Sequence, residues 1–165
     1  MKDISDKRRD PVCNMWVDGG PYQRDYSGMH FIFCSAQCLE RFNANPHLYI
    51  GHPGQLAPAQ RGEVSMKKRY LVLTQLPAAD IANRITHCLM EMMGVEDVSM
   101  TGRKLIIRYD LLQATLKQIE NVIEGSGGRL NPSVWSRLRR GLIDLLEANE
   151  LDARELPPPH GGHRH

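Results

Sequence analysis

Three cysteines in a short stretch constrain this chain more than any other feature of its sequence. Cys13, Cys34 and Cys38 lie within residues 10–50, and the fourth cysteine, Cys88, lies far downstream. A unit of about 40 residues buries too little apolar surface to fold without a further source of stability. A bound metal ion would supply it, because metal binding to a small domain contributes directly to folding. The alternative is that the cysteines are buried free thiols.

The local pattern predicts where the thiols lie. Residues 29–34, "MHFIFC", alternate as a strand does, and Ser35 is a natural N-cap for a helix that ends near Pro46. Cys34 would then end the strand and Cys38 would lie in the first helical turn, on the same side of the junction. Because a helix N-terminus lowers a thiol pKa, we expect Cys38 to be a thiolate near neutral pH. With the first cysteine in a preceding turn, the order is that of a small zinc-ribbon-like module.

The same stretch resembles a known family. The shared elements are Asp-Pro-Val-Cys-x-Met, Tyr-x-Gly, Phe-Cys-Ser-x-x-Cys and a closing Phe, Pro and Tyr, found at Asp10–Met15, Tyr26–Gly28, Phe33–Cys38, Phe42, Pro46 and Tyr49. They resemble the YHS domain, within the wider TRASH group of metal-binding modules. The resemblance implies that Cys13, Cys34 and Cys38 bind a metal. It also implies heavy-metal sensing or trafficking, with a copper-transporting ATPase or another metal-handling protein as partner.

The sequence leaves the fourth ligand and the metal open. His30 shares a strand face with Cys34, but four strand residues span about 13 Å, too far to share one ion. Met15 follows Cys13 by two residues, and a tight turn would bring its thioether to the same point, although methionine is also an ordinary core filler. Soft sulfur ligands favour Cu(I), and the three cysteines with Met15 would suffice for it. Structural Zn(II) is the alternative, and it needs four ligands.

Beyond the cysteines, the chain divides into a linker, a second domain and a tail. Gly and Pro mark residues 51–66 as the linker, and residues 157–165 are a histidine-rich tail. Within the second domain, residues 67–150, strands are expected over 68–76, 95–100, 104–110 and 129–131. Helices are expected over 77–94 and 112–128. This order is the ferredoxin-like βαββαβ. The expected fold is therefore α+β, a zinc-ribbon-like module and a ferredoxin-like domain with an extra C-terminal helix.

The extra helix begins at Pro132 and has an apolar face. Its periodic apolar residues are Val134, Leu138, Leu142 and Leu145. Their spacing of three and four residues is that of an amphipathic helix.

The second domain resembles the heavy-metal-associated domain, the fold of copper chaperones and of the N-terminal modules of transport ATPases. The resemblance rests on Leu89, on "GVEDVSM" from Gly94 onward and on "IIRYD". The family's Cys-x-x-Cys is missing, because Ala78 and Ile81 stand at those two positions. We therefore expect no metal ligation there, and a docking or scaffold role instead.

Two other groups of residues could bind metal. One lies on a predicted helix and comprises His87, Cys88, Met90, Met92 and Met93. Methionine and free cysteine are ordinary core residues, so we favour the interpretation that Cys88 and Met92 pack in the core and that the others line its border. The other group is the tail's His160, His163 and His165, which could chelate a divalent ion or do nothing specific.

The composition argues against several classes of protein. The 21 Lys and Arg nearly balance 19 Asp and Glu, for a net charge of +2, so no nucleic-acid-binding face is expected. The longest apolar run, "YLVL", is far below the ~20 residues of a membrane span, and the charged N-terminus is not a secretion signal. The sequence contains no nucleophile motif and no phosphate loop, so we do not expect an enzyme.

The sequence therefore predicts a cytoplasmic Cu(I)-binding protein for copper buffering, delivery or resistance. The cytoplasm is expected because four cysteines without a secretion signal fit a reducing compartment. The alternative is an interaction or regulatory protein whose first domain holds a structural zinc.

Overall fold

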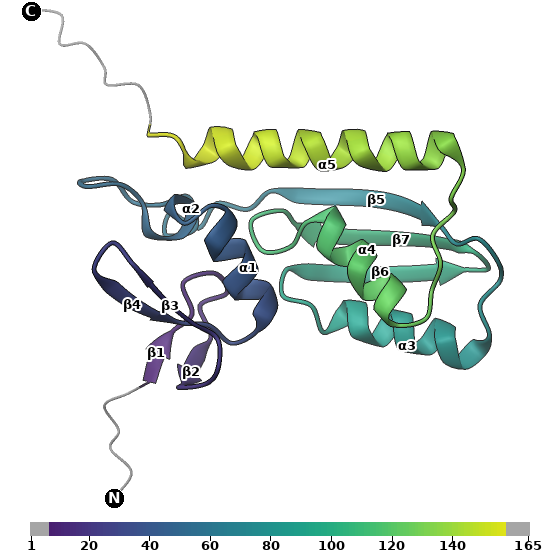
Figure 1. The fold of residues 1–165 in the computed structure, drawn as a ribbon, viewed down its shortest axis with the longest axis horizontal. Coiled ribbons are helices and arrows are strands. Elements are labelled where there is room, and N and C mark those ends of the chain that lie inside the picture. Colours follow the sequence, from purple (N-terminus) through teal and green to yellow (C-terminus); the bar gives the residue numbers. More distant parts are fainter. Residues whose placement is uncertain (1–6, 158–165) are drawn as a thin grey trace, which may run out of the picture.

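Residues 7–157, which the computed structural model describes, form five helices and small antiparallel sheets (Figure 1). The tail histidines His160, His163 and His165 lie outside the described residues. No helix in residues 7–157 combines the length and the apolar character needed to cross a membrane.

The N-terminal module consists of two antiparallel strand pairs and two helices. Its elements are β1 (Lys7–Arg9), β2 (Trp16–Asp18), β3 (Gln23–Tyr26), β4 (Met29–Ile32), α1 (Ala36–Ala44) and α2 (His47–Ile50). β1 pairs with β2, and β3 pairs with β4. The predicted turn, hairpin and helix therefore occur in the expected order, and the β1–β2 pair is an addition that encloses the turn of the first cysteine.

Phe42 of α1 is the centre of the N-terminal core. Its ring is fully buried, and four aromatic rings surround it at centroid distances between 4.9 and 6.3 Å. Those rings belong to Tyr26, Phe31, Phe33 and Tyr49. Because each aromatic side chain buries roughly 150–250 Å², this cluster is what holds α1 against β3, β4 and α2.

The second module is built on a three-stranded antiparallel sheet with the order β5-β7-β6. Its elements are β5 (Met66–Val72), α3 (Ala79–Met90), β6 (Val95–Thr101), β7 (Lys104–Asp110), α4 (Leu116–Gly125) and α5 (Val134–Glu155). The strand expected over 129–131 is reduced to a single antiparallel bridge between Leu73 and Leu130. Pro132 follows directly and has no N–H to extend the pairing.

The central strand β7 carries the core of the second module. Its Leu105, Ile107 and Tyr109 alternate along the strand and are fully buried, as a period of two requires for one face. Ile85 and Leu89 of α3 are buried as well. α3 packs against β6, and α4 lies between α3 and α5 (Figure 1).

A buried carboxylate attaches α5 to the rest of the second module. Glu147 of α5 accepts hydrogen bonds from the Tyr109 hydroxyl, from the Leu116 backbone N–H at 2.9 Å and from the Arg69 guanidinium at 3.0 Å. These donors come from β7, from the start of α4 and from β5. A buried charge is tolerated when it is paired and hydrogen-bonded in this way, so Glu147 fixes α5 alongside β5.

α1 joins the two modules through the side chain of Gln37. Its amide donates to the carbonyls of Met93 at 2.7 Å and Gln113 at 3.0 Å, and it accepts from the Met93 N–H at 3.2 Å. Buried side chains of both modules form one continuous apolar cluster. The segment predicted as a linker, residues 51–66, also takes part in the packing, because Ala57 is fully buried.

Replacing Glu147 with alanine is expected to destabilise the protein by about 3–5 kcal/mol, because it leaves the partly buried Arg69 charge and two further donors without an acceptor. Chemical denaturation measures the change. Glu150→Ala is the matched control, since Glu150 also lies on α5 and forms a partly exposed ion pair with Lys67. Its replacement should destabilise the protein by about 1 kcal/mol or less. Equal losses for the two variants would contradict the role given to Glu147.

Candidate metal centre

The three predicted thiols converge at the N-terminus of α1. The sulfur of Cys34 lies 3.5 Å from that of Cys13 and 3.6 Å from that of Cys38. A carboxylate oxygen of Asp10 joins them, and the four ligand atoms all lie within 4.8 Å of one another. Three sulfurs at ~2.3 Å from one ion are roughly 3.8 Å apart in a tetrahedron and roughly 4.0 Å apart in a trigonal plane. The thiols are therefore spaced to hold one ion after only small movements.

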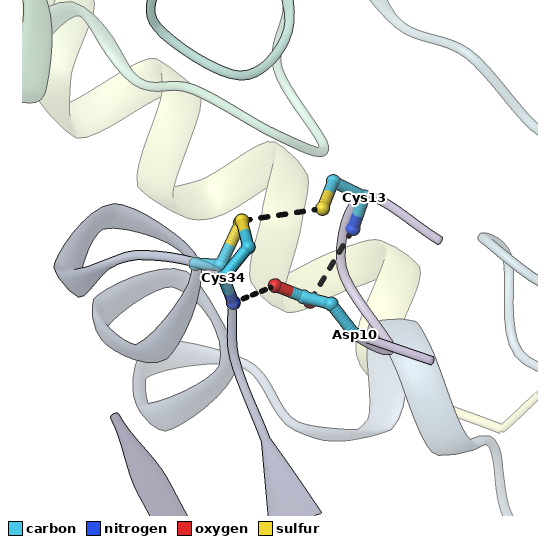
Figure 2. A group of neighbouring side chains, drawn as sticks. Asp10, Cys13 and Cys34 are labelled. Atoms are coloured by element: carbon cyan, nitrogen blue, oxygen red, sulfur yellow. Dashed lines mark hydrogen bonds between the residues drawn. The ribbon is translucent and has the colours of Figure 1, made fainter. Parts of the chain in front are cut away.

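Asp10 holds together the two segments that supply the thiols (Figure 2). Its Oδ1 accepts hydrogen bonds from the backbone N–H groups of Val12 at 2.8 Å and Cys13 at 3.4 Å. Its Oδ2 accepts from the N–H of Cys34 at 2.8 Å. The carboxylate is fully buried, and such a group needs these donors to remain charged. Asp10 therefore connects the turn of Cys13 to the β4–α1 junction.

The start of α1 positions Cys34 and Cys38. Ser35 is the N-cap, as predicted, and its hydroxyl accepts the N–H of Cys38 at 3.3 Å. Cys38 is fully buried, whereas Cys13 and Cys34 are partly exposed. Solvent and any incoming ligand therefore reach the cluster from the side of Cys13 and Cys34.

The acidic thiol of the cluster is Cys13, and the expectation that Cys38 is the thiolate is wrong. A hydrogen bond from the Cys38 thiol is the main cause that lowers the pKa of Cys13 to about 7, and the Met15 backbone N–H lowers it further. The same hydrogen bond, together with burial and the charge of Asp10, raises the pKa of Cys38. Burial and two negative neighbours thus outweigh the helix N-terminus at this position.

Near neutral pH Cys34 and Cys38 therefore keep their protons, and Cys13 is the thiol that ionises most readily. Burial also raises the pKa of Cys34, to about 11. Binding of a metal to three thiolates must release the retained protons, so the apparent metal affinity falls as the pH falls.

Two further residues weighed as ligands occupy different positions. Met15 lies beside the cluster, because its backbone N–H donates to Cys13, and its side chain is 48% exposed. The imidazole of His30 is engaged with the carboxylate of Asp25 at 2.6 Å. His30 therefore has a partner other than the thiols, in line with its rejection on distance.

The group of His87, Cys88, Met90, Met92 and Met93 is dispersed over the end of α3 and the turn that follows it. His87 lies 3.4 Å from the carboxylate of Glu91, Met90 is exposed, and Met92 is buried in the core. Among residues 7–157, a group of three or more His, Cys, Asp or Glu side chains able to share one ion occurs at Asp10 and the three cysteines alone.

Asp10 is the site residue that reasoning from the sequence missed. Its position was noted as part of a motif, but no role was given to its side chain. The signal was present, because an Asp often bonds the backbone two residues further on, here the N–H of Val12. The second bond, to Cys34, crosses between distant segments and has no local signature.

The segment that carries the three thiols also matches a known domain family. Residues 9–53 match the YHS domain family. This YHS module spans about a quarter of the chain and contains all three converging thiols. No curated protein matches the sequence. Among solved structures, a candidate copper-ion-binding protein from Bacillus anthracis str. Ames, determined in solution, is 26% identical over 41% of this chain and 97% of its own, with a TM-score of 0.38. That likeness is too loose to carry any argument here.

Removing the Asp10 carboxylate is expected to weaken metal binding without removing a thiol. Asp10→Ala leaves the N–H groups of Val12, Cys13 and Cys34 without their acceptor, so the thiols lose their relative positions. Loss of such a supporting group costs roughly 10–100-fold in metal affinity, measured by competition with a chromophoric chelator. Asp18→Ala, in the exposed strand β2, is the control. An unchanged affinity for Asp10→Ala would contradict the positioning role.

The order of thiol acidity is measurable in the metal-free, reduced protein. Alkylation by iodoacetamide, mapped by mass spectrometry, should occur first at Cys13 with a midpoint near pH 7. Cys38→Ala should move that midpoint upward, because the hydrogen bond that stabilises the thiolate is lost. Cys88→Ala is the control and should leave it unchanged. Preferential alkylation of Cys38 would contradict this order.

Proposed function

We propose that the protein binds Cu(I) at Cys13, Cys34 and Cys38 and serves copper buffering, delivery or resistance in the cytoplasm. The observation that carries the proposal is the convergence of three sulfurs, with adjacent pairs 3.5 and 3.6 Å apart, at one helix N-terminus. The match of this segment to the YHS family supports metal binding in general. The choice of copper rests on ligand chemistry.

The number and softness of the ligands favour Cu(I) over zinc. Thiolate and thioether ligands select Cu(I), which is content with two or three sulfurs, whereas structural zinc takes four ligands in a closed tetrahedron. Both carboxylate oxygens of Asp10 already accept backbone hydrogen bonds, so recruiting one of them for zinc would weaken the contact that positions Cys13 and Cys34. We propose Met15 as an additional soft ligand, because its half-exposed side chain is free to turn toward the neighbouring thiolate.

Partial exposure of the site supports exchange of the ion with another protein. Two of the three thiols, Cys13 and Cys34, are partly exposed to solvent. An incoming thiolate can therefore bind the ion before Cys38 dissociates from it. We propose a copper-transporting ATPase or another metal-handling protein as the partner. The proposal assigns the chain no catalytic step, because three thiolates leave an ion electron-rich and poorly suited to activate water.

We further propose that the second module has a ferredoxin-like arrangement and serves as a docking or scaffold unit. Its element order and the sheet order β5-β7-β6 support this, with the Leu73–Leu130 bridge in place of the fourth strand. Where the heavy-metal-associated family carries two cysteines, Ala78 is the N-cap of α3 and Ile81 lies in its first turns. Neither side chain can ligate a metal, so the copper site belongs to the YHS module.

One observation favours a second candidate, a structural zinc in an interaction or regulatory protein. The carboxylate of Asp10 lies within 4.8 Å of all three sulfurs, so three thiolates and one oxygen could close a tetrahedron. In that case the ion would stabilise the YHS module and would not exchange.

A paired competition titration with Cu(I) and Zn(II) separates the two candidates. Cu(I) should displace zinc from the wild-type protein, and Cys34→Ser should abolish tight binding of both ions. Met15→Ala should weaken Cu(I) by roughly tenfold, about 1.4 kcal/mol, and affect zinc less. Cys88→Ser is the control and should change neither. A site that holds zinc against Cu(I) and ignores the Met15 change would replace the copper proposal with the structural-zinc one.

A further inference from the structure

The outer face of α5 exposes a continuous row of large apolar side chains. Val134 and Trp135 are 77% and 81% exposed, and four leucines further along the helix are 55–63% exposed. The leucines are Leu138, Leu142, Leu145 and Leu146. Figure 1 shows α5 as a long outer helix at one border of the molecule, and the exposure of these side chains places the row on its solvent side.

The row has the spacing of a helix–helix interface. Trp135, Leu138, Leu142 and Leu145 follow one another at intervals of three, four and three residues, the a/d pattern of paired helices. Six such side chains at roughly 100 Å² each expose on the order of 600 Å² of apolar surface, at or above the largest patch of an ordinary monomer. A surface of this size approaches the ~800 Å² that each partner contributes to a standard interface.

The contacts that this chain makes through α5 use other sides of the helix. The buried residues of α5 are Glu147 and Leu151, and Glu150 bonds Ser65 and Lys67 of the second module. Among residues 7–157, no segment covers the row.

We propose that α5 of a second copy of this chain covers the row, packed antiparallel. The exposed charges of the helix are divided along its length: Arg137 and Arg139 lie in its first half, and Asp152 lies in its second half. A parallel pair would place like charges together, whereas an antiparallel pair places each basic half beside an acidic half. The surface is thus complementary to itself, as a two-fold symmetric interface requires.

One alignment pairs charged residues and most of the apolar ones, with Leu138 opposite Ala153 and Leu142 opposite Asn149. When Leu145 of each copy faces Leu146 of the other, Arg139 faces Asp152 across the interface. The same alignment sets Trp135 of one copy against Leu156 of the other, where Leu156 is 70% exposed. The largest side chain of the row is then covered at each end, and both ends of the interface are equivalent.

The proposal is tested by sedimentation equilibrium of the full chain, metal-free and in a thiol-free reductant, over a series of protein concentrations. The wild type should associate to twice the chain mass of 18.7 kDa. Leu145→Glu should weaken the dimer at least about 100-fold, because it removes a buried leucine from both copies. Leu76→Glu is the control, since Leu76 is at least as exposed as Leu145 (69% against 57%) but lies outside α5. Circular dichroism verifies that both variants remain folded.

A charge exchange tests the antiparallel direction. Arg139→Glu and Asp152→Arg should each weaken the dimer, and the double variant should restore most of the loss relative to Asp152→Arg. The double variant is compared with Asp152→Arg because Asp152 also accepts a hydrogen bond from Asn45. The single Asp152→Arg variant and the double variant both lose this bond. No restoration would overturn the antiparallel arrangement.

Three results would overturn the proposal altogether. The first is a wild-type protein that stays monomeric throughout the series, and the second is a dimer that Leu145→Glu leaves intact. The third is a monomer that binds vesicles of phosphatidylcholine and phosphatidylserine through Leu145, which would make the row a membrane-surface contact.

Discussion

The candidate metal centre depends on one buried carboxylate. Asp10 bonds the turn that carries Cys13 with one oxygen and the N–H of Cys34 with the other. The same negative charge has an electrostatic effect, because it adds to the Cys13 hydrogen bond and burial in keeping the proton on Cys38. Asp10 therefore fixes the spacing of the sulfurs and contributes to the retention of a proton that an arriving ion must displace.

α1 connects this centre to the rest of the molecule. Cys34 and Cys38 flank a turn whose Gln37 is bonded to Met93 and Gln113 of the second module. Gln37 satisfies a backbone N–H and two carbonyls that would otherwise be left without partners inside the interface. Gln37 therefore attaches the helix that carries Cys38 to the α3–β6 and β7–α4 turns, which lie next to each other. This contact gives a physical basis for a scaffold that supports the metal-binding module without ligating metal itself.

Local patterns in the sequence predicted the parts that depend on neighbouring residues. The Ser35 cap and the start of α1 were predicted because a helix cap and an i, i+4 pair are short-range features. α3, β6, β7 and α4 were located by their periodicity, with ends differing by a few residues. The last strand shrank to the bridge at Leu130 because Pro132 stops the pairing.

The features that were missed depend on contacts between distant segments. The bond from Asp10 to Cys34 and the insertion of Gln37 both join polar side chains to remote backbone groups, which no periodicity reveals. The thiol with the lowered pKa was predicted wrongly for the same reason. Helix position alone favours a thiolate at Cys38, but burial and the approach of Cys13 reverse the order, and both follow from the tertiary fold.

X-ray absorption spectroscopy of the copper-loaded full chain tests the central claim most directly, because it observes the atoms bound to the ion. The account predicts a Cu(I) first shell made of sulfur alone, with about three short sulfur neighbours. Cys13→Ser should remove one of them. A first shell with nitrogen or oxygen neighbours, or one that is unchanged in Cys13→Ser, would contradict copper binding by the three converging thiols.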